Sequence, residues 1–208
     1  MTAVEDFQSE TETLAATVQR HVLALYAAYL AGELPEQDVV PLIVAAINQA
    51  TSAAVALGDV WMVAQIEERT GAAALATGVP PTDDADRLTK AVSTVLAERD
   101  SASLSNDPAV ARLDRLARSE TFEAAQNGTW QAMQQQPLVE GWARQFDGAA
   151  CELCTWWARL GPDGPRVWPK AHPFQRHKGC NCQPRIVLTD NIKSTGYTRR
   201  LERNARAS

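Results

Sequence analysis

Four cysteines and one histidine in the last third of the chain have the spacing of metal ligands. Two residues separate Cys151 from Cys154, and twenty-two residues later His177, Cys180 and Cys182 follow within six positions. A Cys-x2-Cys turn aims two thiolates at one point, and thiolates with an imidazole form the usual ligand set of tetrahedral Zn²⁺. We therefore predict a structural zinc site that has five candidate ligands for four positions.

Other interpretations of these cysteines are disulfide pairs, buried thiols, and a different metal or a cluster. We expect no secretory signal, because the N-terminal residues lack a basic stretch followed by an apolar one. Thiols in a reducing compartment are more often ligands than bridges, which favours zinc. His172 is a sixth candidate ligand, whereas the neighbouring carboxylates of Asp147 and Glu152 are expected to lie behind the ligands or at the surface.

The same ligand set argues against an enzyme. A catalytic zinc ion keeps an open position and has a general base beside it, whereas a thiolate-rich site with surplus ligands is typical of a closed structural centre. The Gly161–Gly164 segment has the composition of a turn and not of a phosphate-binding loop. The sequence contains neither a Gly-x-Ser-x-Gly elbow nor a His-Glu-x-x-His motif. We expect no catalytic activity.

Charge is distributed unevenly along the chain. Residues 1–110 contain 16 acidic and 5 basic side chains, whereas residues 111–208 contain 9 and 15. We do not expect the acidic half to contact DNA. The basic half suits phosphate or an acidic protein surface, although a basic tail can also be merely solvated. The tail carries Arg199, Arg200, Arg203 and Arg206.

The elements that position the metal ligands follow a long helical region. Apolar residues recur every three or four positions from Phe7, which predicts a first helix that ends at Gly32. A second helix is predicted from about Pro41 to Gly58, followed by a third segment over Val60 to Ala76. The alanine-rich stretch from 39 to 57 contains Pro41, Asn48 and Gln49, so we expect it to be too polar to span a membrane.

Two further start signals follow. Thr82 is predicted to cap a fourth helix whose first turn is acidic, and Leu88, Val92 and Val95 mark its buried side. Asn106-Asp107-Pro108 begins a long helix that ends near Gln134–Pro137, with a bend near Asn127-Gly128.

After this helix the composition changes to aromatic residues, prolines and short β-like runs, at 138–146 and 185–188. The prediction is a mainly α fold, in which a helical N-terminal region precedes a small zinc-stapled α+β module. The predicted divisions are 1–106, 107–190 and a basic tail over 191–208. Trp156, Trp157 and Trp168 are expected to pack over the metal loop, and base stacking is the alternative.

An ordered set of motifs resembles the C-terminal domain of the Mu F-like minor head proteins of tailed bacteriophages. The resemblance covers about residues 110–190. It rests on Ala117-Arg118-Ser119-Glu120-Thr121, Ala125-Gln126-Asn127, Gly141-Trp142, Phe146-Asp147, Cys151-x2-Cys154 and His177-x2-Cys180-x-Cys182.

The sequence also departs from this family pattern. Lys178 and Gly179 stand where a proline and a variable residue are common, and Asn181 replaces the usual arginine between the last two cysteines. One extra residue separates Trp142 from Asp147. The metal ligands are retained, whereas any contact that the arginine makes in the family is lost.

The resemblance implies a non-enzymatic virion protein, made in the host cytoplasm and incorporated into the capsid as a minor head or head morphogenesis component. Its implied partners are phage capsid, portal or scaffold proteins. Homo-oligomer contacts and contact with packaged DNA are further expectations, and no membrane contact is expected. Two rival functions are a zinc-dependent His-Cys nuclease and a nucleic-acid-binding zinc module.

Overall fold

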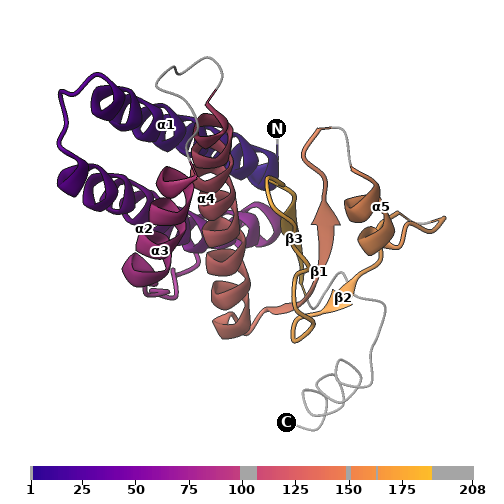
Figure 1. Cartoon of the computed structure of the whole chain (residues 1–208). Helices are drawn as coiled ribbons and strands as arrows, with labels where there is room; N and C mark the ends of the chain where they lie inside the picture. Colours follow the sequence, from indigo (N-terminus) through magenta and orange to yellow (C-terminus); the bar gives the residue numbers. More distant parts are fainter. Residues whose placement is uncertain (1, 99–106, 149–150, 163, 189–208) are drawn as a thin grey trace, which may run out of the picture.

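The chain forms a bundle of long helices followed by a small sheet (Figure 1). The computed structural model describes residues 2–98, 107–148, 151–162 and 164–188. The predictions for Asn106, for Asp163 in the Gly161–Gly164 turn and for the basic tail over 191–208 lie outside these residues. The mainly helical fold with a small C-terminal α+β part is confirmed. Its elements are α1 (Ala3–Leu30), α2 (Glu36–Thr70), α3 (Ala85–Ala97), α4 (Pro108–Gln135), β1 (Val139–Gln145), α5 (Glu152–Ala158), β2 (Trp168–Pro169) and β3 (Gln183–Leu188).

Helices α1, α2 and α4 pack against one another, and α3 lies on α2 and α4. The predicted apolar stripes meet in one core, in which Val22, Ile43, Ile47 and Leu113 are fully buried. Helix α4 begins as predicted, because the Asp107 side chain accepts a hydrogen bond from the backbone N–H of Ala109 and Pro108 occupies the first turn. The predicted division at 106/107 precedes α4, so this one bundle contains helices from both predicted parts.

Helix α2 corrects the prediction of two separate helices. It runs without interruption through Gly58 and ends at Gly71, whose φ of 67° is the left-handed conformation that terminates many helices. It also begins at Glu36, so Pro41 lies beyond the predicted first turn. Pro41 has no backbone N–H to donate to the Gln37 carbonyl oxygen, so α2 lacks one hydrogen bond near its start but continues as a helix.

Gly58 lies inside α2 at the point where α4 crosses this helix. A Cβ atom on Gly58 would lie 2.7 Å from the backbone nitrogen of Thr129, and one on Gly128 would lie 2.7 Å from the carbonyl oxygen of Val55. The two glycines therefore allow the backbones of α2 and α4 to approach closely. The sequence predicted a bend near Asn127-Gly128, and Gly128 lies inside the single helix α4, which runs from Pro108 to Gln135.

Helix α3 begins two residues later than predicted. Asp84, and not Thr82, occupies the position before its first residue, and the neighbouring Asp83 carboxylate accepts a hydrogen bond from the N–H of Ala85. Leu88 and Val92 are buried as predicted.

The expectation that the middle of α2 is too polar for a membrane span was wrong by composition. An 18-residue window of α2 reaches a mean hydropathy of 1.7, and 44% of that window is buried inside the protein. The core helix of a bundle passes the same test of length and composition, and α2 packs against α1, α3 and α4.

The sheet has the antiparallel order β2-β1-β3, and it forms a second core with the C-terminal halves of α2 and α4. Trp142 pairs with Trp168 on one side and with Ile186 on the other. The side-chain oxygen of Gln65 in α2 accepts a hydrogen bond from the backbone N–H of Ile186. Residues 139–188, called the C-terminal module below, therefore pack directly on the helical bundle.

Candidate metal centre

The first two candidate ligands lie at the start of α5. Cys151 is the N-cap residue, and its sulfur accepts a hydrogen bond from the backbone N–H of Cys154 at 3.4 Å. Because α5 begins there, the Cys154 side chain projects into the interior, where it is fully buried, whereas Cys151 is exposed. The two sulfurs face the same region.

The other three candidates lie on the loop before β3. The backbone N–H of Cys180 donates to the carbonyl oxygen of His177, and Gly179 between them has a φ of 78°, which favours glycine. The backbone N–H of Cys182 donates to the sulfur of Cys180 at 3.4 Å. From α4, the Gln126 amide donates to the carbonyl oxygens of Cys180 (2.7 Å) and Cys182 (2.9 Å), which fixes this loop on the bundle.

The structure brings all five candidates together around the Cys154 sulfur. That sulfur lies 3.4 Å from Nε2 of His177 and 3.3 Å from the sulfur of Cys180, and the Cys151 sulfur lies 3.0 Å from the same imidazole nitrogen. The ligand atoms form two close groups that share Cys154, namely Cys151, Cys154 and His177, and Cys154, Cys180 and Cys182.

These distances suit a metal ion better than disulfides. All four cysteines are free, and 3.3 Å between two sulfurs is far longer than the roughly 2.05 Å of a disulfide bond. Two thiolates on one tetrahedral Zn²⁺ with Zn–S bonds of about 2.3 Å are about 3.8 Å apart, so a small adjustment accommodates an ion. The cluster can hold a metal ion, and its donor set fits zinc.

The electrostatics of the cluster lead to the same conclusion. Hydrogen bonds from the Cys154 and Cys180 thiols lower the pKa of Cys182 to about 2, with help from the Asp147 backbone and the Arg144 charge. Hydrogen bonding to Cys180 raises the pKa of Cys154. The Cys182 thiolate is thus stabilised by the protonated thiols of Cys154 and Cys180. When a metal ion binds, these thiols lose their protons, and the positive charge of the ion takes over the stabilisation.

Arg144 of β1 lies against this cluster, and the sequence interpretation did not identify it. Its guanidinium is buried, lies 3.6 Å from the Cys154 sulfur and donates to the Gln175 carbonyl oxygen at 2.5 Å. It stacks 4.1 Å above the Phe174 ring, and no carboxylate among the described residues pairs with it. A buried arginine without an acid requires another negative partner, which thiolates supply. The alternation that buries Trp142 also places Arg144 on the inner face.

Asn181, which stands where the Mu F-like pattern commonly has an arginine, connects the metal loop to α1. Its side chain is buried and donates to the carbonyl oxygen of Gln8 at 2.7 Å, while the Gln8 amide donates to the Asn181 carbonyl oxygen at 3.2 Å. Gln183 donates to the side-chain oxygen of Asn181 at 3.0 Å. The metal loop is therefore held by α1 as well as by α4.

His172 does not join the cluster, because its ring stacks on Trp168 with 4.2 Å between centroids. Neither Asp147 nor Glu152 belongs to the close groups of ligand atoms. Trp157 lies beside the His177 ring at 5.8 Å, so it packs against a ligand as predicted. Trp156 contradicts the packing prediction, because 61% of its surface is exposed.

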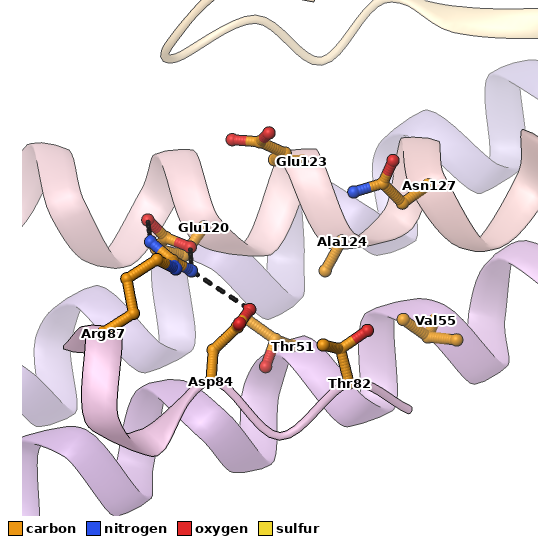
Figure 2. Close-up of a pocket in the computed structure, with 9 residues that line it drawn as sticks. All are labelled: Thr51, Val55, Thr82, Asp84, Arg87, Glu120, Glu123, Ala124 and Asn127. Carbon is orange, nitrogen blue, oxygen red and sulfur yellow. Dashed lines mark hydrogen bonds and ion pairs between the residues drawn. The ribbon is translucent and has the colours of Figure 1, made fainter. Parts of the chain in front are cut away.

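A separate hollow lies between α2, α3 and α4 (Figure 2). It encloses about 290 Å³, and the Arg87 guanidinium across it contacts Glu120 at 2.6 Å and Asp84 at 3.1 Å. None of the five cluster residues lines this hollow. Cys154, Cys180 and Cys182 of the metal cluster belong instead to the second core, and no cluster residue forms a wall of this hollow.

Comparisons with known proteins identify one family. Neither the curated proteins nor the solved structures contain a match to the chain. The model of the VG15 protein family, a phage-like family of viral genes, matches residues 1–203, which is nearly the whole chain. This match is consistent with a phage protein, and the chain belongs to the VG15 protein family.

Proposed function

We propose that this protein is a structural component of the phage virion, a minor capsid or head morphogenesis protein of the Mu F-like type that acts in head assembly near the portal or on the inner shell. The observation that carries the proposal is the convergence of Cys151, Cys154, His177, Cys180 and Cys182, the residues that match the Mu F-like motifs, at one point. The VG15 family match supports a phage protein independently.

The metal has a structural role in this proposal. Cys154 lies in the same apolar cluster as Trp142 and Ile186, whereas Cys151 is exposed, so the ion would join the start of α5 to the loop before β3 at the edge of this core. A ligand set of thiols and imidazole in surplus leaves no position for substrate on a tetrahedral ion. The implied ion is Zn²⁺, which would stabilise the C-terminal module and would take no part in a reaction.

Of the five candidates, Cys151, Cys154, His177 and Cys180 form the proposed first choice of ligands. They occur as two turns with the same x2 spacing, which aims both ligands of each turn at one point. Backbone N–H donors do not separate Cys180 from Cys182, because the Cys180 sulfur accepts one from Cys182 and the Cys182 sulfur has one from Asp147. Cys182 would then be a buried neighbour, so Cys180→Ser should lower zinc affinity more than Cys182→Ser.

Quantitative mass spectrometry of purified virions and procapsids tests the proposal. The expected result is a low copy number of this chain relative to the major shell protein. Absence from both particles would contradict the proposal. Plasmid cleavage by the purified protein with Mg²⁺, Mn²⁺ or Zn²⁺, abolished by His177→Ala, would instead support the nuclease alternative, and binding to DNA that weakens steeply with salt would support the nucleic-acid-binding module.

A further inference from the structure

Among the described residues, four large exposed apolar side chains lie in one stretch of fifteen residues, 153–167, inside the C-terminal module. They are Leu153, Trp156, Leu160 and Val167, and each is between 46% and 61% exposed. Leu153 and Trp156 are three residues apart on α5, so they share a face of that helix. An exposed tryptophan among aliphatic neighbours is typical of the centre of a protein interface.

Arginines surround these apolar side chains. The guanidinium of Arg159 lies 4.6 Å from the Trp156 ring centroid, and that of Arg166 lies 4.4 Å from the Trp168 ring centroid. The backbone N–H of Arg166 donates to the Ala158 carbonyl oxygen, which brings the two arginines onto neighbouring backbone. Neither arginine has a carboxylate partner among the described residues. We call Leu153, Trp156, Arg159, Leu160, Arg166 and Val167 the α5 patch.

A surface of opposite charge lies at the other side of the molecule, where α1 connects to α2 (Figure 1). Glu33, Glu36 and Asp38 are exposed there, together with Leu42 at 42% exposure. Beside them is a hollow of about 530 Å³, and none of the described residues that line it is basic. The hollow is lined by Tyr29, Glu36, Gln37, Val40, Ser93, Leu96 and Ala97. We call this surface the α1–α2 corner.

We propose that the α5 patch of one copy docks on the α1–α2 corner of a second copy. The hollow has a mixed lining in which Val40, Leu96 and Ala97 offer apolar contacts to the Trp156 side chain, and the exposed carboxylates complement Arg159 and Arg166. A protein partner fits better than nucleic acid, because three of the four apolar members of the patch, Leu153, Leu160 and Val167, are aliphatic and offer no ring for a base to stack on. Since the two surfaces lie on opposite sides of one chain, the contact is head-to-tail and builds a ring or a filament. This inference does not depend on the proposed function.

Sedimentation velocity from micromolar to submillimolar concentration tests the proposal. The wild-type chain should self-associate, and high salt should weaken the association because the arginines and carboxylates are at the surface. A patch variant, Trp156→Ser with Arg159→Glu, and a corner variant, Glu33→Lys with Glu36→Lys, should each associate about tenfold more weakly or worse. Leu75→Ser is the control, because Leu75 is 85% exposed and outside both surfaces.

Mixing the two variants is the decisive experiment. Each mixed pair retains one intact contact, formed by the patch of the corner variant and the corner of the patch variant, so a 1:1 mixture should yield a heterodimer and nothing larger. Unchanged thermal melts and zinc contents would show that both variants are folded. A wild-type chain that stays monomeric, variants that associate normally, or a mixture without a heterodimer would overturn the proposal, as would binding of a single-stranded oligonucleotide that competes with self-association.

Discussion

The crossing of α2 and α4 leads to a prediction whose sign opposes helix propensity. In the interior of a helix, Gly→Ala ordinarily stabilises a protein by about 1 kcal/mol. At Gly58 the new Cβ atom would lie 2.7 Å from the Thr129 nitrogen and 2.8 Å from the Ala125 carbonyl oxygen, whereas ordinary Cβ contacts begin at 3.4 Å. Both obstacles are backbone atoms, so the helices have to separate.

We expect Gly58→Ala to destabilise the protein by about 2 kcal/mol. Overpacking costs about 1–3 kcal/mol, a rigid backbone places this site at the upper end, and the gain in propensity offsets about 1 kcal/mol. For a chain of this size, the loss lowers the melting temperature by about 4–8 °C. Urea and thermal unfolding followed by circular dichroism measure the change in stability. Ala53→Gly, on the exposed face of α2, is the control that measures the difference in helix propensity between alanine and glycine in this helix.

The Gly58→Ala, Gly128→Ala pair refines the same test. A Cβ atom on Gly128 would lie 2.7 Å from the Val55 carbonyl oxygen, at the same crossing. Because one separation of the helices relieves both contacts, the double variant should lose less stability than the sum of the single variants. Stabilisation by Gly58→Ala of the size that propensity alone gives would refute the close crossing.

Three further predictions concern residues around the cluster and the bundle. Arg144→Met should weaken zinc binding about 10–100-fold in competition with a chelating dye, because it removes the positive charge beside Cys154; affinity equal to that of an Arg159→Met control would contradict this. Asn181→Arg, which restores the residue usual in the Mu F-like pattern, should cost about 3 kcal/mol of unfolding free energy because position 181 is buried against α1, and a neutral result would remove that argument. Burial raises the pKa of Asp59, but hydrogen bonds from Thr77, Gly78 and Val79 outweigh this effect and hold it below its usual value, so the stability that this carboxylate contributes is present at neutral pH and is lost as pH falls below about 4. In urea unfolding at a series of pH values, Asp59→Asn should lose less unfolding free energy below pH about 4 than the wild-type chain does. An equal loss in both proteins would show that other groups cause it.

The sequence predicted the elements whose signals are local. The apolar period and glycine stop of α1, the Asp107-Pro108 start of α4 and the ligand spacing of the metal cluster all arise from residues close together in the chain. Gly58 was misinterpreted as a helix end because a glycine in sequence cannot show whether it ends a helix or admits a neighbouring one. Position 58 requires a glycine because the backbone of α4 at Ala125 and Thr129 lies against it.

The surroundings of the cluster were beyond sequence analysis for the same reason. Asn181 and Gln8 are 173 positions apart, and no pattern pairs them before the module packs on the bundle. Arg144 was overlooked because an arginine in a strand is ordinarily exposed, and only the thiols that surround it explain its burial. The strand β2 contains two residues, which is too short for an alternating pattern.

We infer that a structural metal ion binds among the five converging side chains, with Cys154 as one of its four ligands. Elemental analysis of the full chain, purified under reducing conditions without added metal, tests it most directly. The expected result is about one zinc ion per chain, lost in Cys154→Ser because that sulfur belongs to both groups of ligand atoms. A folded, metal-free chain with intact Cys151–Cys154 or Cys180–Cys182 disulfides would contradict the claim.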